Sequence, residues 1–288
     1  MRWGLVVGLV VVASACSVPA APTESLPGGG ELVSRFGEAR ALATDGAGRV
    51  YVVDAAASEV VVLDTSGGIL DRLGGTDSQA FLDITDVDPT NGQSIFVADA
   101  GTGRIVRFTA EGRAAETVAV PRRLDVESPV RAGEEVGRPV AVAAGPGNTL
   151  YAIEAERGVV LRWDADRALD RVLGGPASSM PLESPAALAI TENGALLVAE
   201  SHRIVVFDAF GAVEGAYPMD DAGRVRNVTV ADGIALAVTE RGVVRLDGKG
   251  GVPVELGEAL VDVAIASPYV YLLTRTRLIR IPLDHSAW

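Results

Sequence analysis

The hydrophobic pattern from residue 31 onward consists of short segments separated by turn residues. Within a segment apolar and polar residues alternate, or a short apolar run occurs, and Gly, Asp, Asn or Ser stands between segments. Alternation with a period of two puts successive side chains on opposite faces of a β-strand. No segment carries a convincing helical repeat, so the pattern predicts an all-β protein made of many short antiparallel strands.

One apolar strand recurs in six copies, at a period of about 40 residues. The copies end in an acid, or in threonine in the last two, and occupy residues 50–54, 95–99, 150–154, 196–200, 235–239 and 270–274. A strand of small residues precedes each copy, a third strand follows it, and a fourth strand follows in the first five copies. Small side chains suit the crowded inner strand of a radially arranged sheet, so each copy predicts one blade of a propeller.

The two ends of the repeat region complement one another. An additional strand, residues 31–36, precedes the first copy, whereas the last copy lacks a fourth strand. If the additional strand completes the last sheet, the termini leave no unpaired sheet edge. The sequence therefore predicts a six-bladed β-propeller over residues 31–288, closed by an N-terminal strand. A linear array of hairpins or two β-sandwiches are the alternatives, and neither explains the additional strand.

The second and fourth copies share a pattern of individual residues. They carry Phe96, Val97, Ala98, Asp99, Arg104, Ile105, Phe108 and Gly112, and Pro185, Gly194, Val198, Ala199, Glu200, Arg203, Ile204, Phe207, Asp208 and Gly211. This pattern resembles the NHL-repeat family of propellers, and the resemblance implies a six-bladed propeller fold. It covers essentially residues 31–284 and weakens in the last two copies, where Thr239 and Thr274 replace the acid.

The first residues are typical of a secretion signal. After Arg2, residues 3–15 form an apolar run that is too short for a membrane-spanning helix of about 20 residues. The run ends in Ala13, Ser14, Ala15 and Cys16, and this sequence resembles the lipobox of bacterial lipoproteins, in which the cysteine is acylated and becomes the N-terminus. Cys16 is the only cysteine of the chain. The alternative is an ordinary signal peptide that is cleaved near Ala15, with Cys16 incidental.

The lipoprotein interpretation also predicts where the protein is located. Residues 1–15 would be a signal peptide, and residues 16–30, rich in Pro, Gly and Ser, a flexible tether. Lipid chains on Cys16, such as palmitate, would then anchor the propeller to a membrane of the cell envelope. Ser17 is not the aspartate that retains lipoproteins at the inner membrane, so we expect the outer membrane if the source is Gram-negative.

Composition narrows the range of partners. The 288 residues include 38 Asp and Glu against 25 Lys and Arg, and the net charge is −13. This balance argues against a nucleic-acid partner. A single cysteine excludes an intrachain disulfide and a site of several cysteine ligands.

Acids and arginines recur around each copy of the repeat. The acids that end the strand are Asp54, Asp99, Glu154 and Glu200, and the loop after it contributes Arg104, Arg157, Arg203 and Arg241. We expect a structural ring in which guanidinium groups meet carboxylates and loop carbonyls and fix blade against blade. In the other interpretation the arginines face an anionic ligand.

The longest insertion between copies is the best candidate for a ligand-facing loop. Residues 121–138 carry Arg122, Arg123 and Arg131 beside several acids. Variable loops on a rigid scaffold often bind ligands. A solvated surface loop is the alternative.

No convincing catalytic set is present. His202 and His285 are the only histidines, which is too few for the histidine set of zinc-dependent lyases, and nothing supplies a hydrolytic triad around His202. We therefore expect a non-enzymatic binding or interaction scaffold, without a cofactor, for a protein or small-molecule ligand. The alternative is a calcium-dependent lactonase, esterase or lyase, with oxygen ligands from Glu38, Asp83, Glu183, Asn227 and Asp262. A structural subunit of an envelope complex is a third option.

Overall fold

The computed structural model describes residues 25–26, 30–74, 80–122, 136–231, 233–247, 251–252, 256 and 258–283. The predicted signal peptide, Cys16 and most of the tether lie outside these residues. No helix in the described ranges is long and apolar enough to cross a membrane.

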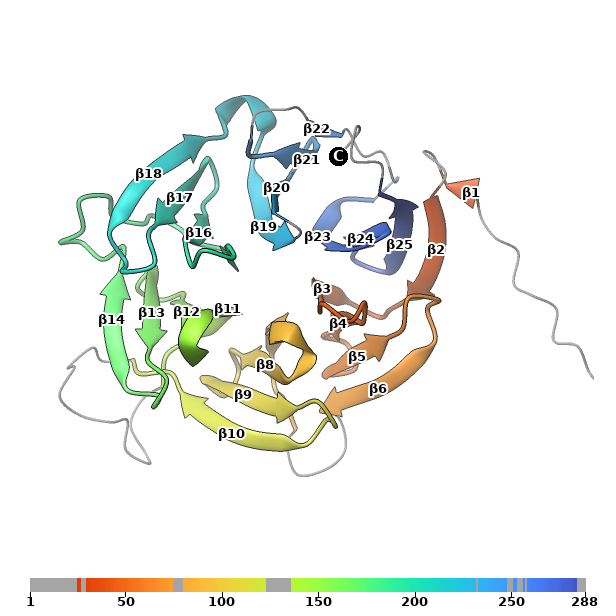
Figure 1. The fold of residues 1–288 in the computed structure, drawn as a ribbon, viewed down its shortest axis with the longest axis horizontal. Helices are drawn as coiled ribbons and strands as arrows, with labels where there is room; N and C mark the ends of the chain where they lie inside the picture. The colour runs from red at the N-terminus through yellow and green to blue at the C-terminus, as the bar shows by residue number, and fades with distance from the viewer. Residues whose placement is uncertain are drawn as a thin grey trace, which may run out of the picture.

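The described chain forms six antiparallel sheets arranged as blades around a central axis (Figure 1). Each sheet runs from an inner strand near the axis to an outer strand at the rim. Blade 1 comprises β3 (Ala39–Thr44), β4 (Val50–Asp54), β5 (Glu59–Leu63) and β6 (Ile69–Gly74). Blade 2 comprises β7 (Ile84–Asp88), β8 (Ser94–Asp99), β9 (Arg104–Thr109) and β10 (Ala114–Ala119). Blade 3 comprises β11 (Pro139–Ala144), β12 (Leu150–Glu154), β13 (Val159–Trp163) and β14 (Leu169–Leu173).

The second half of the ring repeats this order. Blade 4 comprises β15 (Ala187–Ile190), β16 (Leu196–Ala199), β17 (Arg203–Phe207) and β18 (Val213–Pro218). Blade 5 comprises β19 (Val225–Ala231), β20 (Ile234–Thr239), β21 (Gly242–Arg245) and the short β22 (Gly251–Val252). The all-β class and the six blades in a ring, expected from the sequence, are confirmed.

Blade 6 combines strands from both ends of the described chain. It comprises β23 (Leu260–Ala266), β24 (Tyr269–Thr274) and β25 (Arg277–Pro282), followed by β2 (Gly30–Arg35) and β1 (Ser25–Leu26). β2 pairs antiparallel with β25, and Glu31 lies opposite Arg280. The Arg280 guanidinium donates to the Glu31 carboxylate at 2.7 and 3.0 Å. In Figure 1 the red-orange β2 accordingly lies beside the dark blue β25.

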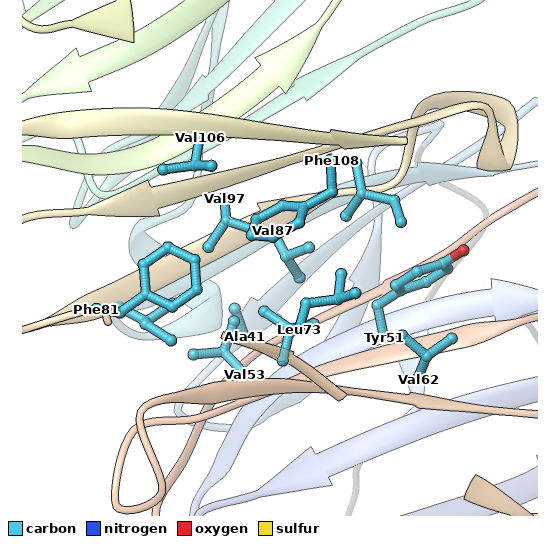
Figure 2. Packing of buried hydrophobic residues seen from close by; sticks show 13 residues of the cluster. Ala41, Tyr51, Val53, Val62, Leu73, Phe81, Val87, Val97, Val106 and Phe108 are labelled. Carbon is cyan, nitrogen blue, oxygen red and sulfur yellow. The ribbon is translucent and has the colours of Figure 1, made fainter. Parts of the chain in front are cut away.

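The hydrophobic core lies between the blades. Figure 2 shows the cluster between blades 1 and 2, where Tyr51, Val53 and Leu73 pack toward Val87 and other buried residues of blade 2. In the described part of the chain, each further pair of neighbouring blades buries a similar cluster, including blades 6 and 1. Each blade therefore buries apolar side chains against both of its neighbours. Burial of apolar area stabilises the folded state roughly in proportion to that area, so these six clusters hold the ring of blades together.

Aspartates after the third strands shape the turns to the outer strands. One carboxylate oxygen of Asp64 accepts hydrogen bonds from the N–H groups of Ser66 and Gly68, at 2.8 and 2.9 Å. Asp164 and Asp208 make the same pair of bonds in blades 3 and 4. Such a side-chain hydrogen bond to the following backbone favours a tight turn. The aspartate that follows the third strand of these blades therefore has a local structural role.

Candidate functional site

A β-bulge recurs at the second residue of the inner strands. The register of inner and second strand shifts between Ala39 and Ala41 in blade 1, and the same shift occurs in blades 2, 3, 5 and 6. A bulge leaves one residue unpaired and turns its side chain in a new direction. The residues at this position are Arg40, Thr85, Val140, Arg226 and Val261, and Ala186 corresponds to them in blade 4.

These six residues, one from each blade, line a single cavity at the face where the inner strands begin. The cavity measures about 440 Å³, and we call it the mouth cavity. Arg224 and Glu240 extend its rim on the side of blade 5, and Asp86 and Asn227 lie deeper on the axis side. The recurring β-bulge therefore places side chains of different chemistry around the mouth cavity.

The arginines of the mouth cavity differ in their partners. Arg40 donates to a carboxylate oxygen of Asp83 and lies 3.5 Å from the carboxylate of Glu38. The hydrogen bond to Asp83 raises the pKa of Arg40, so this guanidinium is charged and its charge is balanced. Arg226 reaches Glu240 only at 3.9 Å. The Arg224 side chain makes no hydrogen bond or ion pair with any described residue.

A second cavity, of about 420 Å³, lies at the other end of the inner strands. Its walls include Asp86, Asp88, Asn227 and Asp262. The two cavities meet at Asp86 and Asn227, which line both of them. A carboxyl and an amide group therefore line the axial region where the cavities meet.

The axial carboxylates connect neighbouring blades. An inner strand has no sheet partner on its axis side, so its N–H groups on that edge need other acceptors. Asp86 accepts from Val142 at 2.8 Å and Asp88 from Ala144 at 2.7 Å, both from blade 2 to blade 3. Asp262 of blade 6 accepts in the same way from Leu42 of blade 1.

Burial alters the acidity of these groups. It raises the pKa of Asp86 to about 7, and it raises the pKa of Asp88 above its usual range. Burial, and after it the nearby charge of Asp86, raises the pKa of Asp262 well above its usual range. The backbone hydrogen bonds that these carboxylates accept lower their pKa values, but the effect of burial is larger. A carboxyl near pKa 7 at the junction of two cavities can hold or release a proton at neutral pH.

The predicted ring acids are buried and engaged by backbone N–H groups. Asp99 is 0% exposed and accepts from the N–H of Asp83 and of Gly101, at 3.0 and 3.2 Å. The remaining ring acids, Asp54, Glu154 and Glu200, also bind the loop that leads into the inner strand of their blade. Their described contacts thus fasten that loop to its blade, and they do not cross to a neighbouring sheet.

The predicted ring arginines also face these loops. Arg104, Arg203 and Arg241 donate to the carbonyls of Ala80, Pro181 and Asp221, at 3.1, 2.8 and 2.6 Å. Arg203 additionally donates to Glu200 at 2.5 Å. Arg157 contributes its backbone N–H, which donates to Glu154 at 3.0 Å.

The predicted ligand-facing loop is described only at its ends. Arg122 is exposed and forms an ion pair with Glu156 at 3.1 Å. Arg123 and Arg131 lie outside the described residues. The residues that sequence reasoning missed are Arg40, Arg224, Arg226 and Asp86. An alignment of the six inner strands by their second residue would have shown which side chains occupy the bulge position.

The oxygen ligands considered for calcium do not all lie in one place: Asn227 and Asp262 line the second cavity, whereas Glu38, Asp83 and Glu183 do not line it. Glu38 and Asp83 are ion-paired with Arg40, Glu183 is exposed, and the carboxylate of Asp262 accepts two backbone N–H groups. Among the described residues no group of three His, Cys, Asp or Glu is placed to hold a metal ion. Calcium prefers six to eight oxygen ligands, including ionised carboxylates. The residues present do not fit such a site.

Comparisons with known proteins show the fold. No protein-family model and no curated protein matches the chain. A gluconolactonase from Xanthomonas campestris is 16% identical, with a TM-score of 0.66, over 90% of this chain and 92% of that chain. A streptogramin B lyase is 12% identical, with a TM-score of 0.63, over 88% and 97%. Virginiamycin B lyase from Staphylococcus aureus, an inactive variant solved with quinupristin, is 11% identical, with a TM-score of 0.60, over 86% and 95%. At these identities the likeness shows a shared six-bladed propeller architecture.

Proposed function

We propose that the chain is a membrane-anchored, extracytoplasmic propeller that acts as a binding scaffold and takes its ligand at the mouth cavity. The observation that carries the proposal is the convergence on this cavity of one equivalent side chain from each blade, five of which stand at a β-bulge. A concave site with a few polar groups among small apolar ones is typical of ligand binding. Anchorage through Cys16, as in an NHL-type lipoprotein of the cell envelope, is part of the same proposal.

The chemistry of the axis favours binding over catalysis. Asp86, Asp88 and Asp262 are occupied as acceptors for N–H groups of neighbouring blades. His202 is exposed on the loop between β16 and β17, and it does not line either cavity. In the described ranges we find no nucleophile paired with a base beside the mouth cavity, as nucleophilic catalysis requires.

Site-specific photo-crosslinking tests the binding face. A photoreactive amino acid replaces Ala186, which is exposed at the rim of the mouth cavity, or Phe210, which is exposed on a turn between β17 and β18. After irradiation in cells, mass spectrometry identifies adducts of either a protein or a small molecule. We expect a specific adduct from position 186 and none in common with position 210. Identical adducts from both positions, or none from position 186, would overturn the proposal.

An enzyme on the same fold is the second candidate. Two observations favour it: the structural neighbours are described as lyases and gluconolactonases, and the Asp86 carboxyl has a pKa of about 7 where the cavities meet. A general acid or base with such a pKa suits proton transfer at neutral pH. Purified protein would then turn over a lactone, an ester or a streptogramin, and Asp86→Asn would abolish the activity. Turnover by the wild type alone would establish this candidate in place of the scaffold.

A further inference from the structure

The mouth cavity has a basic side and an apolar side. Around the ring the bulge positions of blades 1 and 5 hold Arg40 and Arg226, on either side of blade 6. The opposite arc, from blades 3 and 4, presents Val140, Ala186 and Ala187. A ligand that fills the cavity therefore meets cationic groups at one end and small apolar side chains at the other.

The arginines that line the cavity, Arg40, Arg224 and Arg226, outnumber its two carboxyl groups, Asp86 and Glu240. Arg40 is balanced by Asp83, which holds it by a hydrogen bond. Arg224 and Arg226 face a single carboxylate, that of Glu240. In a chain of net charge −13, a cavity lined by more arginines than carboxyl groups is a local exception. Such a concave cationic site attracts anions, because the low-dielectric walls focus the field.

From this arrangement we infer that the mouth cavity binds a small organic monoanion, a carboxylate with a short apolar body, whose charged end is held by Arg224 and Arg226. The inference rests on the proposed binding function and names the ligand class. A guanidinium offers a planar pair of N–H donors that matches the two oxygens of a carboxylate. Arg224 is available for this contact, since no described residue binds its side chain.

The volume and the lining of the mouth cavity limit the size of the apolar part of the ligand. The volume of about 440 Å³ falls in the lower part of the range for small-molecule sites. Val140, Ala186 and Val261 contribute short side chains at the rim, while Asp86 and Asn227 make the deeper wall polar. A second negative charge on the ligand would approach Glu240 or Asp86 and be repelled. The cavity therefore favours one anionic group over a polyanion such as phosphate.

Ligand-observed NMR and calorimetry with sodium butanoate test the inference on the full chain. Butanamide has nearly the same shape without the charge, and inorganic phosphate carries charge without an apolar body. We expect butanoate to bind at least tenfold more tightly than either compound. Arg224→Met and Arg226→Met should each weaken butanoate binding by roughly tenfold, because each removes a charge-assisted hydrogen bond.

Two further variants test whether butanoate binds in the mouth cavity or responds only to the total charge of the protein. Arg171→Met removes an exposed arginine from the outer strand β14 and should leave butanoate binding unchanged. Ala186→Phe fills the apolar side at an exposed position and should weaken binding while the thermal unfolding midpoint is retained. Equal binding of butanamide, equal binding of phosphate, or no effect of Arg224→Met would each overturn the inference.

The outcomes also distinguish this inference from the proposed function. If butanoate does not bind but a specific adduct still forms from position 186, the ligand class is wrong and the scaffold proposal stands. If both the adduct and butanoate binding are absent, both proposals fail.

Discussion

The carboxylate of Asp262, in blade 6, accepts a hydrogen bond of 2.7 Å from the backbone N–H of Leu42, in blade 1. The two residues are 220 positions apart in the chain. Thr44 adds a second link across the same junction by donating its hydroxyl to the carbonyl of Ile265 at 2.7 Å. The junction at which the ring of blades closes is thus held by side-chain bonds to inner-strand backbone, in addition to its apolar cluster.

Removal of the Asp262 carboxyl should weaken this junction. Asp262→Ala removes the carboxylate acceptor of the N–H groups of Leu42 and Val263 at a residue that is 2% exposed. We expect the free energy of unfolding to fall by about 1–3 kcal/mol, the cost of a buried unsatisfied donor. Urea unfolding followed by circular dichroism measures it. Asp220→Ala, at an exposed position, is the control and should change stability little; an equal loss in both variants would refute the role of the bond.

The raised pKa values predict that stability declines as pH rises. Burial raises the pKa of Asp86 to about 7, and that of Asp88 and Asp262 above the usual range, whereas the unfolded chain titrates near pH 4. Between these values the folded protein keeps protons that the unfolded chain releases. The favourable contribution is therefore complete below pH ~4 and declines as pH rises, by at most about 1.4 kcal/mol per pH unit for each carboxyl. For Asp86 it is lost as pH passes about 7.

Urea unfolding at a series of pH values from 5 to 8 checks this dependence. Asp86→Asn has no proton to lose at this position, so we expect a flatter decline of the free energy of unfolding than in the wild type. An unchanged slope in Asp86→Asn would show that Asp86 does not titrate in this range.

The buried acid of the repeat should matter more for local order than for ligand binding. Asp99→Ala removes the acceptor for the N–H groups of Asp83 and Gly101 and for the Thr102 hydroxyl. We expect the free energy of unfolding to fall by about 3 kcal/mol, because several donors lose their acceptor at a position that is fully buried. Asp99→Thr, which introduces the residue type of the last two copies, should lose less. Butanoate binding should persist in both variants if they are folded, and loss of binding would show that the ring acids shape the mouth cavity.

The strand pattern was predictable because it depends on local sequence. The apolar strands at residues 50–54 and 150–154 coincide with β4 and β12, and the fourth strands of the first five copies are present. The acid that ends the first four copies is a local feature of the sequence for the same reason. Its partners are not, since the N–H groups that bind Asp99 belong to a loop whose position depends on the whole blade.

The mouth cavity was not predictable from composition or motif. Arg40 stands in a strand of small residues, and only the register shift between Ala39 and Ala41 sets it apart from its neighbours. Asp86 likewise has no motif around it, and its acceptor role depends on Val142 of the next blade. The first feature depends on the register of two neighbouring strands and the second on a bond to the next blade, and neither has a local pattern in a single sequence.

Calcium titration separates the scaffold from the calcium-dependent enzyme. A ligand that binds only the folded state raises stability according to its concentration and dissociation constant. Because the carboxylate oxygens of Asp262 already accept N–H groups and Asp83 is paired with Arg40, we expect no heat of binding and no change in the unfolding midpoint with millimolar calcium. A saturable rise that Asp262→Asn removes would instead support the enzyme candidate.

The proposed lipid anchor predicts a change of location when the thiol is removed. The thioether that carries the diacylglyceryl group requires a sulfur nucleophile, so Cys16→Ala should abolish acylation, and each lost acyl methylene removes about 0.8 kcal/mol of membrane affinity. We expect metabolic labelling with a palmitate analogue to mark the wild type and not Cys16→Ala, and the variant to leave the membrane fraction. Ser17→Ala, at the next position, is the matched control and should retain both label and membrane association. A Cys16→Ala product that is still labelled and membrane-bound would contradict the anchor, because the chain has no second cysteine to replace it.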